Sequence, residues 1–204
     1  MFKKLASDAL GLSDIGKIIS PTDFDKTDAD DFLLNEDGEK IYFLIKTKAD
    51  EYCFTNLAII HVDGDSAVSS KKTLKRYSYA QHKISDVTLE TAGKIDLDAE
   101  IKFVVGNEKF DIDVRKDQIE QLKDLYKSLL RISELTHENE IYKELAKTSL
   151  DRAASVLQNA RTNENVLAST FKDLTDFSFE WLSSAQEKYH LKDYGFVFEK
   201  YINN

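Results

Sequence analysis

The sequence predicts an α+β protein, in which a small antiparallel β domain is closed by a helix and followed by an antiparallel helical hairpin. Two patterns carry this prediction. From Lys40 to Val114 apolar residues alternate with polar ones, which is the period of half-buried strands. From Asp117 onward apolar residues recur every three or four positions and no strand pattern returns. We therefore expect a β domain over residues 1–137 and a helical hairpin region over 138–204.

The composition is that of a folded chain with an acidic surface. Of the 204 residues, 42% are hydrophobic and 32% are charged, which is too apolar for disorder. The formal net charge of −9 opposes nucleic-acid binding, because that affinity comes from neutralising phosphates with Lys and Arg. The same charge disfavours anionic lipid surfaces.

Cysteine usage and the hydropathy of the chain favour a cytoplasmic location. Cys53 is the single cysteine, so there is no disulfide framework or multi-cysteine zinc cluster, and we expect a small buried hydrophobe at this position. Asp8 and Asp14 interrupt the apolar residues near Met1 too early for a signal-peptide core. The chain contains no apolar run of the roughly 20 residues needed to cross a bilayer.

The first residues predict a short amphipathic helix followed by a loop. Apolar residues at helical spacing between Phe2 and Leu12 indicate the helix, whose expected task is packing on the β domain. A membrane-surface anchor is the alternative. The stretch 21–31 is polar and acidic and is expected to be a loop.

Six or seven strands are then expected in a meander. Turn signals separate them at Lys48–Asp50, at Asp63–Asp65 and at Gly106–Glu108, where Gly, Asp and Asn supply the backbone conformations that tight turns need. The expected strand segments are 41–46, 52–62, 73–79, 84–89, 95–105 and 109–114.

The helical part begins with an amphipathic helix after Asp117 that is expected to cover one end of the sheets. Two further apolar stripes, Ile141–Leu157 and Leu167–Tyr189, flank a polar tip over 158–165 and predict a helical hairpin. Two helices alone bury too little apolar area to be stable. The hairpin must therefore pack against something else.

Two stretches carry a resemblance to a known family. The strand pair around EYCFTNLAIIHVDG, and above all ETAGKIDLDAE at Glu90–Glu100 followed by strand, hairpin and helix, resemble the bacterial pleckstrin-homology (PH) family. The C-terminal third resembles the YvbH-like oligomerisation region. The resemblance implies a PH-like β-barrel of two near-orthogonal antiparallel sheets, capped by a helix, in proteins that form closed cyclic rings enlarged by the helical hairpin.

The first hairpin departs from that of lipid-binding PH domains. Those domains grip inositol phosphates with Lys and Arg in this hairpin, which here reads IKTKADEYCF and contains no arginine. Phosphoinositide binding is therefore not expected from the fold alone.

Three groups of residues are candidate sites. An acidic set in and beside the family-like strand is expected to be an exposed polar face and is nominated as an interaction surface; a divalent cation held by its oxygens is the alternative. It comprises Glu90, Thr91, Asp96, Asp98 and Glu100. A basic cluster is expected to be a solvated strand face or to form salt bridges with an adjacent acidic protomer. Binding of an anionic headgroup, a phosphate or an acidic patch on a partner is the alternative. The cluster comprises Lys71, Lys72, Lys75 and Arg76.

The third group is aromatic and is predicted to make oligomer contacts, since large aromatic side chains anchor interfaces. Intramolecular packing is the alternative. The group comprises Phe171, Phe177, Trp181, Tyr189, Phe196 and Phe198.

The sequence favours a non-enzymatic function. Its four histidines show no ligand spacing, its glycines are isolated, and no nucleophile lies in a catalytic pattern, so we expect no metal and no cofactor. The first hypothesis is a scaffold that self-assembles into a cyclic homo-oligomer and presents a polar surface to an unidentified protein partner. A peripheral membrane module is the second, and a metal enzyme using the acidic face is the third.

Overall fold

The computed structural model describes residues 14–64, 72–91, 98–157 and 167–202. It divides the chain into two compact units. The sheet unit comprises Met1–Ser133 and Lys192–Asn204, and the helical unit comprises Glu134–Leu191. The amphipathic helix predicted over 2–12 lies outside the described residues.

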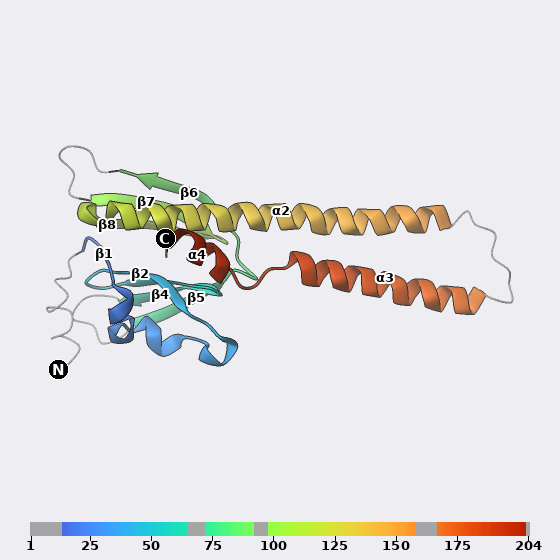
Figure 1. The fold of residues 1–204 in the computed structure, drawn as a ribbon, viewed down its shortest axis with the longest axis horizontal. Helices are drawn as coiled ribbons and strands as arrows, with labels where there is room; N and C mark the ends of the chain where they lie inside the picture. Colours follow the sequence, from blue (N-terminus) through green and yellow to red (C-terminus); the bar gives the residue numbers. More distant parts are fainter. Residues whose placement is uncertain (1–13, 65–71, 92–97, 158–166, 203–204) are drawn as a thin grey trace. The chain divides into compact units, whose positions relative to one another are not determined.

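The sheet unit contains two antiparallel sheets (Figure 1). The five-stranded sheet has the order β1-β2-β3-β4-β5, and the three-stranded sheet has the order β6-β7-β8. The strands of the first are β1 (Lys17–Ile18), β2 (Ile41–Lys46), β3 (Glu51–Thr55), β4 (Ala58–Gly64) and β5 (Lys72–Ser78); those of the second are β6 (Ile84–Glu90), β7 (Asp98–Val105) and β8 (Glu108–Arg115). The predicted α+β class with two antiparallel sheets is confirmed.

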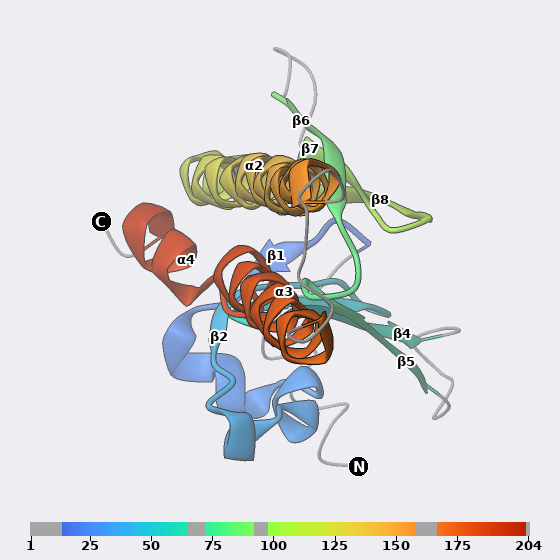
Figure 2. The ribbon, with the colours of Figure 1, turned by 90° about the vertical axis from the view of Figure 1, so that its right-hand side faces the viewer.

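The two sheets form a sandwich joined at Gly16, and no closed barrel is seen among the described strands. The amide of Gly16 donates to the Asp113 carbonyl at 2.8 Å, and the Arg115 amide donates to the Gly16 carbonyl at 3.0 Å. A Cβ at Gly16 would lie 2.7 Å from Cγ2 of Ile45. Only glycine therefore allows the chain to pass this closely between β2 and β8, beside β1 (Figure 2).

A tight turn at Asn56–Leu57 splits the apolar run predicted as one segment over 52–62 into β3 and β4. The Thr55 hydroxyl at the end of β3 accepts hydrogen bonds from the amides of Leu57 (3.1 Å) and Ala58 (2.9 Å). These bonds satisfy amides that the strand ladder leaves unpaired in the turn.

Aromatic rings fill the space between the sheets. Phe103 of β7 stacks on Phe110 of β8 with ring centroids 5.0 Å apart, and Phe54 of β3 meets Phe103 edge-on at 6.0 Å. Tyr77 of β5 packs perpendicular to Phe110 at 5.5 Å. The alternation that predicted the strands thus directs the aromatic side chains on one face of each strand into a shared core.

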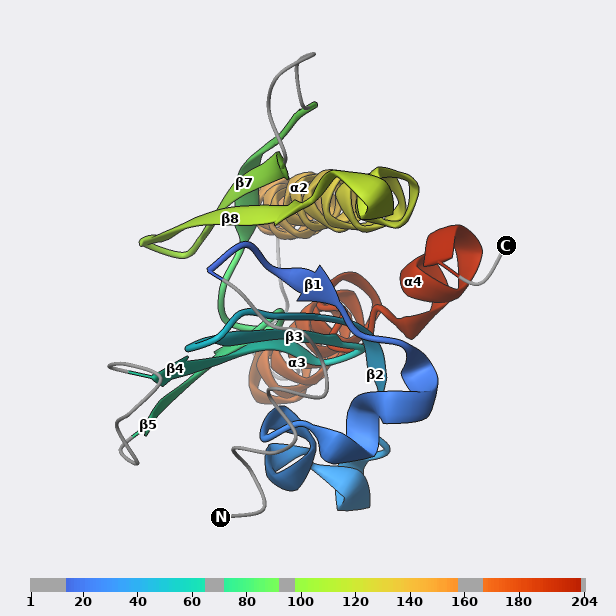
Figure 3. The same cartoon turned by 90° about the vertical axis from the view of Figure 1, so that its left-hand side faces the viewer.

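The other face of the five-stranded sheet is covered by 3-10 helices where a polar loop was predicted. These are η1 (Pro21–Lys26), η2 (Ala29–Phe32) and η3 (Asn35–Asp37), and Figure 3 shows them beside β2. Their apolar residues pack on an outer core that includes fully buried Cys53, as predicted for this cysteine. The buried carboxylate of Glu51 accepts the amides of Asp28 (3.1 Å) and Ala29 (2.8 Å) at the start of η2.

Helix α2 (Ile119–Leu157) follows a single 3-10 turn, η4 (Lys116–Gln118), and begins in the sheet unit. Its first turns bury Leu122, Leu125, Leu129 and Ile132. The helix continues without a break through residues 138–140, where a boundary was predicted, and the division between the units falls at Ser133. Helical hydrogen bonds continue beyond Ile132, the last buried residue of the helix.

The helical unit consists of the rest of α2 and of α3 (Leu167–Tyr189). The two helices run antiparallel, since Tyr142 stacks on Tyr189 at 5.3 Å and the indole of Trp181 donates to the carbonyl of Ala146 at 3.1 Å. The predicted tip over 158–165 lies outside the described residues.

The last helix, α4 (Gly195–Ile202), belongs to the sheet unit, although the segment was predicted as part of the helical region 138–204. Tyr194, Val197 and Phe198 are buried there, and Phe198 stacks on Tyr42 of β2 at 5.4 Å. Burial of these three side chains explains why the chain returns to the sheets.

We expect Phe198→Ala to lower the free energy of unfolding by about 3–5 kcal/mol, because it removes a fully buried ring. The matched control is Phe196→Ala in the same helix, whose side chain is 53% exposed and whose loss should cost about 0.5 kcal/mol. Urea unfolding of the full-length variants measures both values. Equal losses would show that the two rings do not differ in burial.

Candidate interaction surfaces

The outer face of the three-stranded sheet carries a cluster of carboxylates. Along β7 the side chains of Asp98, Glu100 and Lys102 alternate with buried apolar residues and so share this face. The strand register places Glu90 of β6 and Asp113 of β8 on either side of Glu100. We call this surface the acidic face; it comprises Glu90, Asp98, Glu100, Lys102, Asp111 and Asp113.

Lys102 lies within this acidic face and binds two of its carboxylates. Its ammonium group is 2.6 Å from Glu100 and 3.1 Å from Glu90. The hydrogen bonds to Glu100 and Glu90 raise the pKa of Lys102 above its ordinary value. Desolvation, together with the charges of Asp98 and Glu100, raises the pKa of Asp113. One lysine therefore only partly offsets the crowding of negative charge.

The structure brings together three residues of the predicted acidic set. Glu90, Asp98 and Glu100 lie on the acidic face, Thr91 is exposed directly after β6, and Asp96 lies outside the described residues. The sequence reasoning missed Asp111 and Asp113, although their alternation with buried Phe110 and Ile112 on β8 was a usable signal. Among the described residues no group of His, Cys, Asp and Glu side chains could hold a metal ion.

The members of the predicted basic cluster that the structure describes bind carboxylates of the chain itself. Lys72 pairs with Asp28, and Lys75 lies 3.5 Å from Asp63. Arg76 lies on the opposite face of β5 from Lys75, because successive side chains of a strand alternate. Lys71 lies outside the described residues.

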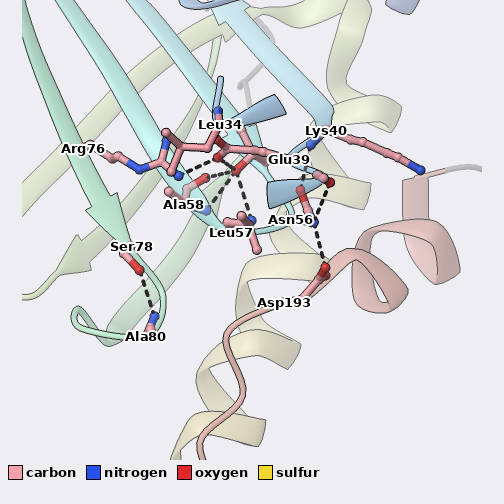
Figure 4. A network of polar contacts seen from close by, with 12 residues as sticks. Leu34, Glu39, Lys40, Asn56, Leu57, Ala58, Arg76, Ser78, Ala80 and Asp193 are labelled. Atoms are coloured by element: carbon pink, nitrogen blue, oxygen red, sulfur yellow. Dashed lines mark hydrogen bonds and ion pairs between the residues drawn. The ribbon is translucent and has the colours of Figure 1, made fainter. Parts of the chain in front are cut away.

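Arg76 belongs to a buried polar network around Glu39 (Figure 4). Its guanidinium donates to the Glu39 carboxylate at 2.8 Å, and the same oxygen accepts from the Thr55 hydroxyl at 2.5 Å. The other oxygen accepts the Leu34 amide at 2.8 Å. Because the Glu39 side chain is fully buried, Arg76 supplies the charge that it needs.

The helical unit exposes large apolar side chains on both of its helices. On α3 these include Phe171, at 71% exposure, with Phe177 and Trp181 from the predicted aromatic group. On α2 they include Ile141 and Leu145, which share a face because they are four residues apart. Among the described side chains of this unit, the exposed large apolar ones are Ile141, Tyr142, Leu145, Val156, Phe171, Leu174, Phe177, Phe179, Trp181 and Leu182.

The exposed residues of α2 occupy two faces of this helix. Tyr142 and Ala146 of α2 contact α3, whereas Ile141 and Leu145 lie about 100° away around the helix. Over residues 134–156 and 168–191 no side chain is buried. Ten exposed large apolar residues on two helices are more than a soluble protein usually leaves in contact with water.

The aromatic group predicted to make oligomer contacts is divided between the two units. Phe171, Phe177, Trp181 and Tyr189 lie on α3, and Phe196 and Phe198 lie on α4 in the sheet unit. Phe198 is fully buried against its own sheet, whereas Phe196 is exposed.

With this geometry established, comparison with known proteins assigns the family. The sequence matches the family described as Bacterial PH domain over residues 9–133. The chain belongs to this family. Residues 144–204 of this PH-domain chain match a second description, YvbH-like oligomerisation region. Neither description names a reaction.

Two similar proteins cover nearly the whole PH-domain chain. One, from Bacillus subtilis (strain 168), is named Uncharacterized protein YvbH and is 67% identical over 204 residues, which are 100% of both chains. The other is the crystal structure of a PH domain containing bacterial protein from Exiguobacterium sibiricum 255-15. It is 51% identical with a TM-score of 0.86, and the match covers 93% of this chain and 100% of that one.

We expect Arg76→Ala to lower the free energy of unfolding by about 3 kcal/mol, because it leaves the Glu39 carboxylate buried without its cation. The control is Lys75→Ala, whose partner lies 3.5 Å away at a partly exposed position and which should cost less than about 1 kcal/mol. Chemical denaturation gives both values. Unchanged stability in Arg76→Ala would show that the protein does not need Arg76 to neutralise Glu39, and would favour the anion-binding interpretation.

We expect Asp113→Asn to stabilise the protein at pH 7 by less than about 1 kcal/mol, since solvent screens an exposed carboxylate. A raised pKa means that the folded state binds the proton more readily, so ionised Asp113 opposes folding. This penalty disappears as the pH falls through the raised pKa toward 3.8, and the variant's advantage should disappear with it. Thermal unfolding across this pH range is the measurement.

Exposed Glu36, mutated to Gln, removes the same charge outside the acidic face and serves as the control. An equal gain in Glu36→Gln would mean that the overall negative charge, and not the crowding at Asp113, accounts for the effect.

Proposed function

We propose that this PH-domain chain is a non-enzymatic scaffold. Its helical unit associates with the helical units of other copies to form a closed cyclic homo-oligomer, and each copy presents the acidic face to a protein partner. The observation that carries the proposal is the helical unit itself, which exposes ten large apolar side chains and buries none in its described part. Covering this surface with a second copy accords with the oligomerisation region matched over residues 144–204.

Exposed apolar side chains on both helices support a ring. A two-fold dimer uses the same patch on both subunits, whereas a head-to-tail contact needs two different patches and closes into a ring when the rotation allows it. The face of α2 with Ile141 and Leu145 and the aromatic surface of α3 with Phe171 provide two such patches on each copy.

The acidic face supports a partner with a basic surface. Charge complementarity raises the rate of encounter and selects against acidic competitors. A ring would repeat this face once per subunit, so that weak single contacts add up to tight binding.

The basic cluster gives the membrane alternative less support. In the part of the chain that the structure describes, Lys72, Lys75 and Arg76 each lie against a carboxylate, which a lipid phosphate would have to displace. No described helix is both long and apolar enough to cross a membrane.

The full-length protein should elute as a single species of several subunits when size exclusion is coupled to light scattering. Phe171→Glu should lower this mass toward that of one chain, because a buried, unpaired carboxylate at the centre of an interface costs several kcal/mol. The control is Ser183→Glu, which adds the same charge to the same helix at an exposed polar position.

A monomeric wild type would overturn the proposal. So would a Phe171→Glu variant that keeps the wild-type mass together with a Phe179→Glu variant that also keeps it, since these are two of the most exposed rings of α3.

A further inference from the structure

The C-terminal tail, residues 192–202, returns to the sheet unit and places three anchor side chains there. Tyr194 and Val197 are 2% and 1% exposed, and Phe198 is fully buried. The family match counts this segment with the oligomerisation region, whereas its contacts assign it to the PH domain. The tail is therefore the second point at which the chain of the helical unit joins the sheet unit.

Aromatic residues of the sheet unit receive these anchors. Tyr79 meets the ring of Tyr194 edge-on at 5.5 Å, and Tyr42 stacks on Phe198 at 5.4 Å. The hydroxyl of Tyr42 also donates to the Glu199 carboxylate at 2.8 Å. Tyrosine combines an aromatic ring with a polar hydroxyl, and such side chains are typical of protein-binding surfaces.

The turn between β3 and β4 forms hydrogen bonds with the start of the tail. The Tyr194 amide donates to the carbonyl of Asn56 at 2.8 Å, and the Asn56 side-chain amide donates to the Asp193 carboxylate at 2.7 Å (Figure 4). The second oxygen of Asp193 accepts the Gly195 amide at 2.7 Å. One carboxylate oxygen of Asp193 thus bonds to the turn, and the other bonds to the first amide of α4.

Gly195 allows this close approach. A Cβ at this position would lie 2.9 Å from the Tyr42 hydroxyl and 3.3 Å from the Asn56 Cβ. A side chain at this position would therefore require the Tyr42 hydroxyl to shift. Glycine leaves the bond between Tyr42 and Glu199 undisturbed.

The sheets do not need the tail to complete their hydrogen bonding. Strands β2 to β5 pair with one another in chain order, with one register shift between Ile41 and Phe43 of β2, and the tail adds a helix and no strand. The buried Tyr79 hydroxyl makes no hydrogen bond with any described group while the tail is in place. The tail thus docks on a finished surface through side-chain anchors, and it leaves one polar group of that surface unsatisfied.

We propose that Tyr42, Asn56 and Tyr79 form a peptide-recognition site for a segment with an acidic residue, a tyrosine and a glycine followed by a phenylalanine three residues later. The occupant of this tail site is the chain's own C-terminal tail, Asp193 to Phe198, which binds reversibly. Covalent attachment keeps its effective concentration high, so free peptides compete poorly in the intact protein. The proposal goes beyond the scaffold function and does not depend on self-assembly.

The test uses the full-length chain with Tyr194→Ala and Phe198→Ala, which empties the site, and a fluorescein-labelled peptide of residues 191–204. We expect the peptide to bind this variant at least about tenfold more tightly than a peptide with the same two alanine changes, and to bind the wild type weakly. If the variant is unfolded by circular dichroism, the wild-type peptide should restore its cooperative thermal transition. Neither binding nor restoration would overturn the proposal.

A cysteine pair, Asn56→Cys with Gly195→Cys, tests which chain supplies the tail. The Cβ separation of 3.3 Å lies within a few tenths of an ångström of the range for disulfides, about 3.5–4.5 Å. Oxidation followed by non-reducing denaturing electrophoresis should give one fast-migrating monomer band. A ladder of covalent oligomers would overturn the intramolecular occupant and show that the tail passes between copies, independently of whether the helical unit assembles.

Discussion

The uneven distribution of buried apolar surface is the constraint on which the rest of this structure depends. Every buried residue that the structure describes lies in the sheet unit, from Gly16 to Ile132 and again from Tyr194 to Phe198. Burial of apolar side chains supplies most of the free energy of folding. The sheet unit therefore has a core of its own, whereas no described side chain of the helical unit is buried.

Local periodicity made most of the sheet unit predictable. Alternation along β7 and β8 follows from one face meeting the aromatic core and the other meeting water, and it fixes which carboxylates share the acidic face. It failed at Asn56 because a two-residue turn within an apolar run leaves no composition signal. It also failed over Pro21–Lys26, where polar residues surround a few apolar ones that cover the outer face of the sheet.

Contacts between residues far apart in the sequence were beyond sequence reasoning. Arg76 and Glu39 are 37 positions apart, and nothing in the local sequence of either indicates the other. The basic cluster therefore looked compact, although alternation sends its members to opposite faces of β5. The aromatic residues after Leu191 had a clear need for burial, but their partners Tyr42 and Tyr79 could be found only from the fold.

The acidic face and the helical unit have opposite effects on association between copies. With a net charge of −9 per chain, copies repel one another, and the repulsion is strongest where Asp98, Glu100 and Asp113 crowd together. Apolar helices attract one another regardless of charge. In the assembly that we propose, the lowest free energy is reached when the helical units bury their rings together and the acidic faces stay apart and in solvent. Separation of like charges thus leaves each acidic face accessible to a basic partner.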